Sequence, residues 1–364
     1  MTIYLDHAAT SPLRPEAREA FLRASEMGGN ASSVHSIGRK AKLALEEARN
    51  DILGAVGAIG SGGLIFTSGG TEANALALHQ ASGLDRIVMS AGEHDSLYGA
   101  AKDATVAPLT VTGMIDLTAL QAILADLDRP FVSVMMANNE TGVINPIADV
   151  AALVHARHGW LHVDAIQALG KIAIDFEALG TDSLSLSAHK VGGPQGVGAL
   201  VYNRDRTIKA LITGSGQELG LRAGTENIPG IAAFAAAVNA TQPQDAGGQA
   251  ATEAALKKLG VTIVGEGAPR VPGILCIAQP NWVSSLQLIH MDISGICVSS
   301  GSACSSGKVK SSRVITAMGR PDLADKVLRI SSGWNTTPAD WQAFFDVWSK
   351  GYEVYLKRHA KEVA

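Results

Sequence analysis

Hydrophobic and polar residues alternate strictly over residues 183–189, where leucines and an alanine are separated by serines and a final histidine. A period of two is typical of a β-strand, and it would place Ser187 and His189 on the same face. Lys190 follows the strand directly, and four glycines lie within residues 191–198. Because a charged ammonium group is costly to bury at the end of an apolar strand, Lys190 either reaches solvent or is held neutral.

The rest of the chain alternates between short apolar strands and amphipathic helices. Residues 63–81 predict a strand, a turn and a helix, residues 129–142 and 160–170 predict strands with polar ends, and residues 147–159 predict a helix. This order predicts an α/β fold with a mostly parallel sheet flanked by helices on both faces. In such a sheet, ligands bind beyond the carboxyl ends of the strands. The polar residues that fall at these ends are Thr71, Asn139, Asp164, Gln167, His189 and Lys190.

A change of pattern after about residue 240 predicts a second domain. Residues 239–252 are rich in Pro, Gly and Gln, and the segments beyond them follow a different rhythm. The chain of 364 residues is long enough for two domains. We expect a large α/β domain over residues 14–245 and a smaller α+β domain formed by residues 1–13 and 246–364.

Composition narrows the class of protein. Hydrophobic residues make up 46% of the chain and charged residues 18%, as in a globular protein. The net charge of −4 gives no reason to expect nucleic acid or an anionic membrane as a partner. Residues 1–12 have neither the basic nor the apolar region of a signal peptide, and residues 228–240 predict a buried, alanine-rich helix. We therefore expect a soluble, cytoplasmic protein that binds no membrane and no nucleic acid directly.

The three cysteines fit a reducing compartment, and their spacing matches no zinc-binding pattern, so we expect no metal site. Cys276 and Cys297 lie in apolar runs and are predicted to be core residues. Cys304 lies in the Ser- and Gly-rich residues 297–313, which we expect to form an exposed, mobile loop. The cationic residues that follow Cys304 would favour its thiolate, and this position indicates a reactive thiol.

Lys190 and its neighbours suggest chemistry with an aldehyde cofactor. A lysine beside His189 and Asp164 could form a Schiff base, which needs an unprotonated amine, although an isolated lysine on a turn is usually a surface residue. Asp164, at the end of its predicted strand, could hold a proton on a pyridine nitrogen or could simply cap the next helix. Gln167 could donate to a ring substituent or could be an ordinary exposed glutamine.

A second group of residues suggests a phosphate site. Residues 68–71 join a predicted strand to a predicted helix, and backbone N–H groups at a helix start bind phosphate with the help of the helix dipole. Thr71 is also an acceptable helix start on structural grounds alone. Ser187 and His189 could supply further donors, and His94 could stack on a planar ring and move protons, although a lone loop histidine is usually structural. Together these features describe a pyridoxal phosphate site.

With these residues in hand, the chain resembles the cysteine desulfurases of the NifS/IscS type, within the class V aminotransferase superfamily. The motifs that carry the resemblance include "YLDHAAT", "FTSGGTEAN", "NNETG", "HVDAIQALGK", "LSAHKVGGPQGVGAL", "RAGTEN" and "SSGSACSS". They occur in the family's order and span essentially the whole chain. The resemblance implies a fold-type I pyridoxal-phosphate-dependent transferase, with Cys304 on a mobile loop of the smaller domain.

The resemblance also implies a role for each cofactor-binding residue. Lys190 would carry the cofactor and act as the base on the substrate Cα, with Asp164 on the pyridine nitrogen and Gln167 near the ring oxygen. His94 would stack on the ring and take part in proton transfer. The residues implied to hold the phosphate are Gly70, Thr71, Ser187 and His189, joined by Thr225 from the other subunit of a homodimer.

The implied substrate is L-cysteine. Arg329 would bind its carboxylate through two hydrogen bonds. Asn139, which would lie beside both the cofactor and the substrate, and Asn30 would assist. Cys304 would attack the substrate sulfur, leaving a persulfide on Cys304 and releasing L-alanine. The persulfide sulfur would then pass to an acceptor protein such as an iron–sulfur assembly scaffold, although a tRNA-thiolation relay or a nitrogenase-specific partner is equally compatible with the sequence.

Two departures from the family pattern bear on substrate preference and loop behaviour. Ser332 replaces a large apolar residue beside Arg329, and Arg313 stands where a histidine is common. A selenocysteine lyase or an aminotransferase of the same superfamily is the nearest alternative, although an aminotransferase needs no cysteine on a loop. A more distant alternative is a non-catalytic sulfur-relay scaffold, which would have no use for Lys190 and Asp164.

Overall fold

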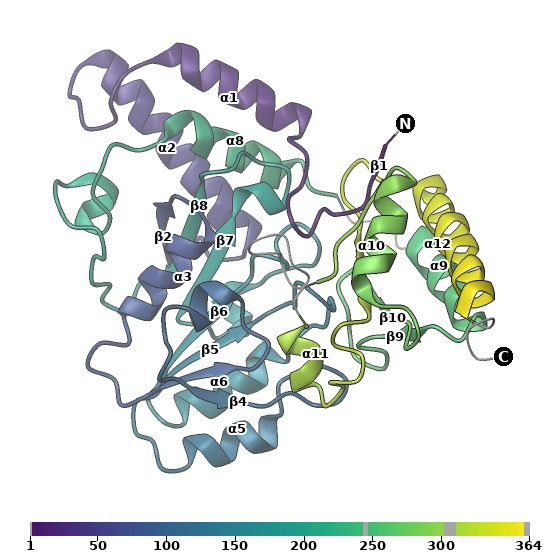
Figure 1. The fold of residues 1–364 in the computed structure, drawn as a ribbon. Helices are drawn as coiled ribbons and strands as arrows, with labels where there is room; N and C mark the ends of the chain where they lie inside the picture. The colour runs from purple at the N-terminus through teal and green to yellow at the C-terminus, as the bar shows by residue number, and fades with distance from the viewer. Residues whose placement is uncertain (1, 243–246, 302–310, 360–364) are drawn as a thin grey trace.

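The computed structural model describes residues 2–242, 247–301 and 311–359. The chain forms a larger body around a central sheet and a smaller body that contains both ends of the described chain (Figure 1). Helices α1 (Pro15–Met27) and α2 (Ser36–Ala55) lie on the larger body. Cys304 falls outside the described residues.

The central sheet has seven strands in the order β2-β8-β7-β6-β5-β3-β4. All strands are parallel except β8, which runs antiparallel to both of its neighbours. This confirms the predicted α/β fold with a mostly parallel sheet. In spatial order the strands are β2 (Gly62–Thr67), β8 (Gly198–Asn203), β7 (Ser183–Ser187), β6 (Trp160–Asp164), β5 (Phe131–Met135), β3 (Ile87–Ser90) and β4 (Thr105–Ala107).

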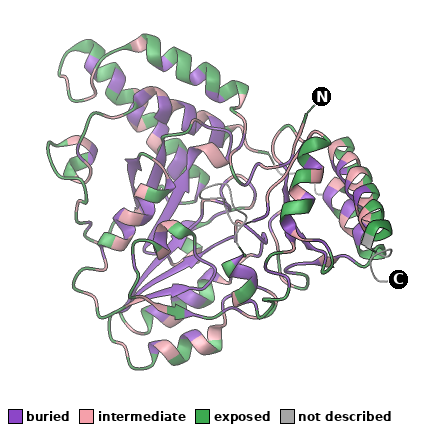
Figure 2. Ribbon diagram, in the orientation of Figure 1, coloured by how far each residue is buried: buried purple, intermediate pink, exposed green. Residues whose placement is uncertain are grey.

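Both faces of this sheet are buried, as the purple strands of Figure 2 show. Along β2, Leu64 and Phe66 belong to one hydrophobic cluster, whereas Ile65 between them belongs to a cluster on the other face. This alternation follows from the two-residue period of a strand. The helices of the larger body also include α3 (Gly70–His79), α4 (Asp95–Tyr98), α5 (Leu117–Leu124), α6 (Ile147–His155), α7 (Phe176–Leu179) and α8 (Ile228–Asn239), with 3₁₀ turns η1 (Ala188–Lys190) and η2 (Gln217–Gly220).

The smaller body has its own sheets and its own core. A core cluster contains Trp282, Phe344 and Trp348. The N-terminal strand pairs with the C-terminal part of the chain, and the boundaries predicted near residues 13 and 245 stay a prediction. The elements are β1 (Ile3–Tyr4) paired with β11 (Ile296–Cys297), the antiparallel sheet β12 (Val327–Ser331), β10 (Ile274–Ala278) and β9 (Thr262–Ile263), and helices α9 (Gly247–Lys258), α10 (Ser284–Ile293), α11 (Arg313–Ala317) and α12 (Pro338–His359).

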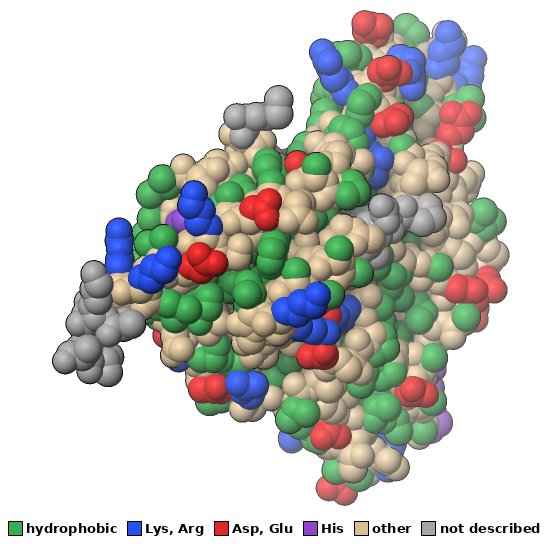
Figure 3. Space-filling model, turned by 90° about the vertical axis from the view of Figure 1, so that its right-hand side faces the viewer, with side chains coloured by type: hydrophobic (Ala, Val, Ile, Leu, Met, Phe, Trp, Pro, Cys, Tyr) green, Lys and Arg blue, Asp and Glu red, His purple; other side chains and the backbone are tan. Residues whose placement is uncertain are grey.

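Several of the exposed large apolar side chains lie on helices of the smaller body, whereas others lie on the larger body. Ile289 and Ile293 on α10 and Val354 on α12 are among them, with Ile293 81% exposed. A groove of about 490 Å³ lies between these two helices, and Leu286, Val354, Lys350 and Arg358 are among the residues that line it. Figure 3, which views the molecule from this side, shows hydrophobic and charged side chains interspersed over the surface. No helix in the described part of the chain is long and apolar enough to cross a membrane.

Two expectations about local structure are wrong. The strand predicted over residues 183–189 ends at Ser187, because Val191 N–H and Gly193 N–H both donate to the Ala188 carbonyl and turn the chain. Ser187 and His189 therefore do not share a strand face. Cys276 is fully buried as predicted, but Cys297 is only half-buried because it lies in the short strand β11.

A buried ion pair fastens η2 to the larger body. Arg49 donates from Nη1 and Nη2 to the two carboxylate oxygens of Glu218, at 2.9 and 2.8 Å, and Phe66 N–H donates to the same carboxylate at 2.9 Å. Glu218 and Leu219 have positive φ angles of 46° and 59°, a region that side chains other than glycine rarely adopt. The ion pair offsets this backbone strain.

We expect Glu218→Ala to lower the free energy of unfolding by about 3 kcal/mol, because it leaves the Arg49 guanidinium and Phe66 N–H without their buried acceptor. The exposed Glu47→Ala should change it by less than about 0.5 kcal/mol. Chemical denaturation of both variants measures the difference. Equal stabilities of the two variants would contradict a structural role for this pair.

Candidate active site

The predicted site residues meet at the carboxyl ends of the central strands. Asp164 is the last residue of β6, Lys190 lies in η1 directly after β7, and Gly70 begins α3 after β2. The N-terminal segment between β1 and α1 crosses this edge of the sheet. Its Ala8 carbonyl accepts hydrogen bonds from Lys190 Nζ at 2.7 Å and from Gln167 Nε2 at 2.9 Å.

Lys190 is held in an environment that favours its neutral amine. Nζ donates to the carbonyl oxygens of Ala8 and Ala9, both at 2.7 Å. Burial and the nearby positive charge of Arg329 lower the pKa of Lys190 to about 8, and the carboxylates of Asp6 and Asp164 oppose this shift only partly. A substantial fraction of the amine is therefore unprotonated near pH 8, as a Schiff-base lysine requires.

Asp164 is almost completely buried, and both of its oxygens accept hydrogen bonds. Asn74 Nδ2 donates to Oδ2 at 2.8 Å, and Ile166 N–H donates to Oδ1 at 3.0 Å. Burial raises the pKa of Asp164, whereas these donors and the positive charges of His94 and Lys190 lower it. A protonated pyridine nitrogen beside Asp164 would favour the carboxylate further. The contact with Ile166, two residues further on, is of the kind that caps a turn, so Asp164 also supports the chain that follows β6.

The start of α3 offers a phosphate cradle. No described side chain caps this helix start, so its first N–H groups remain available for an anion. Ser187 Oγ is buried and has no hydrogen-bond partner among the described residues. A Cβ added to Gly70 would lie 3.6 Å from Ser187 Cβ, so the helix start and this hydroxyl are neighbours. Thr71 is exposed at the same helix start.

His189 stands next to the cradle as a neutral imidazole. Its Nδ1 lies 3.2 Å from Thr10 Oγ1. Burial and the positive charge of Lys190 lower the pKa of His189 to about 4. A neutral ring donates one hydrogen bond, so any contribution to phosphate binding would come from an N–H group rather than from a charge.

These residues fit pyridoxal phosphate. An orphaned buried hydroxyl at Ser187 and an uncapped helix start suit the phosphate group, Lys190 suits the aldehyde, and Asp164 suits the pyridine nitrogen. Gln167 adds a buried amide whose Oε1 accepts a hydrogen bond from Lys171 Nζ at 3.1 Å. Burial and the charge of Lys190 lower the pKa of Lys171 to about 7.

Arg329 lies in β12, in the smaller body, and is buried except for 4% of its surface. Nη2 donates to Asp6 Oδ1 at 2.7 Å and Nη1 donates to the Asn139 carbonyl at 3.0 Å. Nε is buried without a partner among the described residues. Asn139 therefore lies next to Arg329, and its backbone carbonyl makes the contact. Asn30, by contrast, lies in the connection between α1 and α2, where its side chain accepts a hydrogen bond from Ser32 N–H.

His94 is the exposed residue that begins α4. Its Nδ1 accepts a hydrogen bond from Ser96 N–H at 3.1 Å, which leaves Nε2 for another partner. Arg313 fixes this segment, since its guanidinium donates to Asp95 Oδ1 and to the Glu93 carbonyl, both at 2.6 Å. The same guanidinium lies 3.7 Å from the centroid of the Tyr98 ring. Arg313, which stands where the resembled family commonly has a histidine, therefore connects α11 to α4.

The described residues on either side of Cys304 converge on Glu140. Ser312 Oγ donates to Glu140 Oε2 at 2.6 Å, and a Cβ added to Gly301 would lie 2.8 Å from the same oxygen. Glu140 is buried, and burial raises its pKa. Gly301 and Ser312 therefore both lie beside one carboxyl group, and Ser312 is hydrogen-bonded to it.

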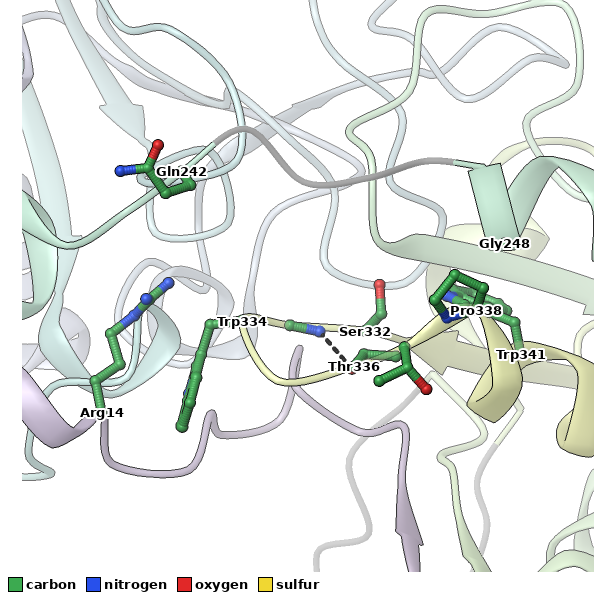
Figure 4. A pocket seen from close by; sticks show the side chains of 10 residues that line it. Arg14, Gln242, Gly248, Ser332, Trp334, Thr336, Pro338 and Trp341 are labelled. Carbon is green, nitrogen blue, oxygen red and sulfur yellow. Dashed lines mark hydrogen bonds between the residues drawn. The ribbon is translucent and has the colours of Figure 1, made fainter.

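Ser332 lines a cavity of about 250 Å³ beside the site (Figure 4). The Arg14 guanidinium lies 5.6 Å from the centroid of the Trp334 ring on the wall of this cavity. Ser332 also lines a smaller adjoining cavity together with Lys190. The small side chain of Ser332 therefore faces two cavities, one of which Lys190 also lines.

Thr225 is exposed on the opposite side of the cradle, in a cavity of about 190 Å³ that is also lined by Ser68. Its assignment to the phosphate of a second subunit stays a prediction.

Sequence reasoning missed several residues that support the site. Asn74, Glu140 and Lys171 are buried polar residues in contact with a predicted site residue or with Ser312, and His162 is a buried residue in contact with Asn74. The positions of two of them carried a signal. His162 lies two residues before Asp164 on a strand, and Asn74 lies one helical turn after Gly70, so each shares a face with a site residue.

Comparison with known proteins identifies the family. The family model for aminotransferase class V matches residues 3–344, so the chain belongs to that family. The chain is 37% identical to a cysteine desulfurase of Cereibacter sphaeroides, over 95% of this chain and 94% of the relative. It is also 37% identical to a putative cysteine desulfurase NifS of Bacillus subtilis, over 92% and 91%.

Solved structures agree with this family. The X-ray structure of a NifS-like protein from Rickettsia africae matches with a TM-score of 0.89 and 35% identity, covering 97% of this chain and all of that chain. Another NifS-like protein matches with a TM-score of 0.86 and 29% identity. The predicted resemblance to cysteine desulfurases is confirmed at the level of family and fold.

We expect the Lys190 amine of the apoprotein to react with pyridoxal phosphate with a midpoint between about pH 7 and 9, because its pKa is lowered to about 8. Raising the pH through this window increases the neutral, nucleophilic fraction. Borohydride trapping followed by peptide mass spectrometry measures modification at Lys190 as a function of pH. A midpoint equal to that of N-acetyl-lysine would contradict the lowered pKa.

Proposed function

We propose that this protein is a pyridoxal-phosphate-dependent cysteine desulfurase that converts L-cysteine to L-alanine and forms a persulfide on Cys304. The observation that carries the proposal is the meeting of Lys190 and Asp164 at one edge of the sheet, each with partners that suit its role. The relatives named cysteine desulfurases support L-cysteine as the substrate. Pyridoxal phosphate, when bound, supplies an aldehyde for the amine and a ring that accepts the electron pair left on Cα.

Arg329 is the residue proposed to bind the substrate carboxylate. Its guanidinium is buried, Nε has no partner within the described chain, and Asp6 holds only one of its nitrogens. A buried guanidinium with an unpaired N–H favours a carboxylate ligand, because the new hydrogen bond removes a desolvation cost. Asn139, whose carbonyl accepts from Nη1, would fix the orientation of the fork.

Lys190 is proposed to move the substrate Cα proton. Once its Nζ is free of the cofactor, the lowered pKa lets it accept a proton near neutral pH and return it later. The carbonyls of Ala8 and Ala9 would hold the amine in place during this exchange. His94, with Nε2 free of the bond that occupies Nδ1, is the second proposed proton carrier.

Cys304 is proposed to take the sulfur. Its thiolate attacks the substrate sulfur, so that an S–S bond forms and the substrate S–Cβ bond breaks. The electron pair of the broken bond is taken up with protons at the substrate carbon, which gives L-alanine. The overall reaction, enzyme thiol plus L-cysteine giving enzyme persulfide plus L-alanine, is balanced without an external oxidant or reductant.

The remaining expectations about context belong to this proposal. We propose a cytoplasmic homodimer in which Thr225 reaches the phosphate of the partner subunit, and exposure of Thr225 in its cavity supports this assignment. The persulfide sulfur would pass to an acceptor protein such as an iron–sulfur assembly scaffold. The phosphate site would consist of Gly70, Thr71, Ser187 and His189.

We expect purified protein, L-cysteine and a thiol reductant to yield L-alanine, and Cys304→Ala to reduce the rate about 100-fold or more. Cys297→Ala is the matched control, since Cys297 is a half-buried cysteine in β11, and it should keep the wild-type rate. Alanine is quantified by chromatography. Equal rates from wild type and Cys304→Ala would exclude Cys304 as the sulfur acceptor.

Alternative substrates serve as further arms of this experiment. Alanine formed from selenocysteine but not from cysteine would indicate a selenocysteine lyase. Amino transfer to a 2-oxo acid would indicate an aminotransferase. A protein that binds no pyridoxal phosphate and forms no alanine would favour the sulfur-relay scaffold.

A further inference from the structure

We propose that His162 and Asn74 form a buried hydrogen-bond relay that orients Asp164 and keeps it a carboxylate at the site of the cofactor's pyridine nitrogen. The inference rests on the proposed function and names positioning residues for it. Asn74 Oδ1 lies 3.1 Å from His162 Nε2, and Asn74 Nδ2 donates to Asp164 Oδ2 at 2.8 Å. Asn74 and His162 are both fully buried.

The relay continues behind His162 into the sheet. His162 Nδ1 lies 3.0 Å from Ser183 Oγ in the neighbouring strand β7, and Trp160 Nε1 donates to the same oxygen at 3.0 Å. Trp160 and His162 lie two residues apart in β6, so they and Asp164 share one face of the strand. One strand face therefore carries the carboxylate and the groups that support it.

Donor and acceptor counting fixes the direction of every bond. A carboxylate only accepts, so the Asn74 amide nitrogen must face Asp164 and its oxygen must face His162. His162 Nε2 must then carry the hydrogen. Burial lowers the pKa of His162 to about 3, so the ring is neutral and its Nδ1 can only accept.

Ser183 completes this assignment. Its hydroxyl donates to His162 Nδ1, and its oxygen accepts from the Trp160 indole, which can only donate. All bonds from Trp160 to Asp164 therefore point toward the carboxylate. Ser185 Oγ, 3.3 Å from His162 Nε2, lies to the side of this path and is not needed for it.

The relay matters because burial of Asp164 favours the protonated acid, and this opposes the neighbours that favour its charged form. Those neighbours include His94 and Lys190 as well as the Asn74 amide. A protonated Asp164 could not hold a proton on a pyridine nitrogen by charge. The fixed donor of Asn74 shifts this balance toward the carboxylate, and the His162 N–H prevents the amide of Asn74 from turning its oxygen to Asp164.

A purely structural role for His162 is the competing explanation, since its ring stacks on Phe131 with centroids 6.4 Å apart and 23° between the planes. His162→Phe separates the two explanations because phenylalanine keeps an aromatic ring but donates no hydrogen bond. His162→Gln keeps one N–H donor without the ring. Ser185→Ala is the matched control for a change beside the ring but off the relay.

We expect apoprotein labelled with ¹⁵N at histidine to show His162 as the neutral Nε2–H tautomer between pH 5 and 8. We also expect His162→Phe to weaken pyridoxal phosphate binding about 10-fold or more and to shift the pH at which the visible band of the bound cofactor changes. His162→Gln should recover affinity to within about threefold of wild type, and Ser185→Ala should bind as wild type does. The affinities come from equilibrium titration of the apoproteins.

The outcomes distinguish failure of the relay from failure of the proposed function. An Nδ1–H tautomer, or a folded His162→Phe variant with wild-type affinity and band titration, would overturn the relay even if alanine is produced. A Nε2–H tautomer in a protein that binds pyridoxal phosphate but produces no alanine would leave the relay in place and overturn the desulfurase assignment. Melting temperatures of the variants identify any that fail to fold, and Asn74→Ala then tests the same relay from its other member.

Discussion

The carbonyl oxygens of Ala8 and Ala9 are the constraint on which the site depends. They lie in an N-terminal segment that crosses the carboxyl edge of the sheet, and they hold Lys190 at an apolar position that would otherwise exclude an ammonium group. Ala8 also accepts from Gln167. A backbone carbonyl oxygen accepts a hydrogen bond from a lysine, but it carries no full negative charge that would stabilise the ammonium form. The amine is thereby fixed in space while desolvation still lowers its pKa.

Two of the charged side chains at this edge of the sheet, Arg329 and Asp164, each have more than one hydrogen-bond partner. Arg329 shares its guanidinium between Asp6 and a backbone carbonyl, and its Nε has no partner among the described residues. Asp164 receives neutral donors rather than a direct ion pair. In the proposed function, this arrangement would leave positive charge for a substrate carboxylate and negative charge for a ring nitrogen, while the buried groups keep enough hydrogen bonds to be stable.

Local patterns in the sequence were sufficient to predict the sheet, its functional edge and the residues Lys190 and Asp164, because strand period and strand ends are short-range properties. The same patterns failed at His189, where bonds between Ala188 and later residues turn the chain after β7. They did not predict the contact of Glu140 with Ser312, which are 172 positions apart in the sequence. They also did not predict the contact of Asp95 with Arg313, which are 218 positions apart. Such pairings are set by how the two bodies pack, and no spacing in one sequence reveals them.

The link between Asp6 and Arg329 has a consequence for how the molecule is made. These residues are 323 positions apart, and β1 pairs with β11 rather than with any strand near it in sequence. During synthesis, β1 and Asp6 therefore lack these partners until almost the entire chain has been made. Closing so long a loop is entropically costly and slow, so the central sheet can form first. The candidate site would then be completed only at the last step of folding, and a chain that ends before β12 would contain Lys190 without Arg329.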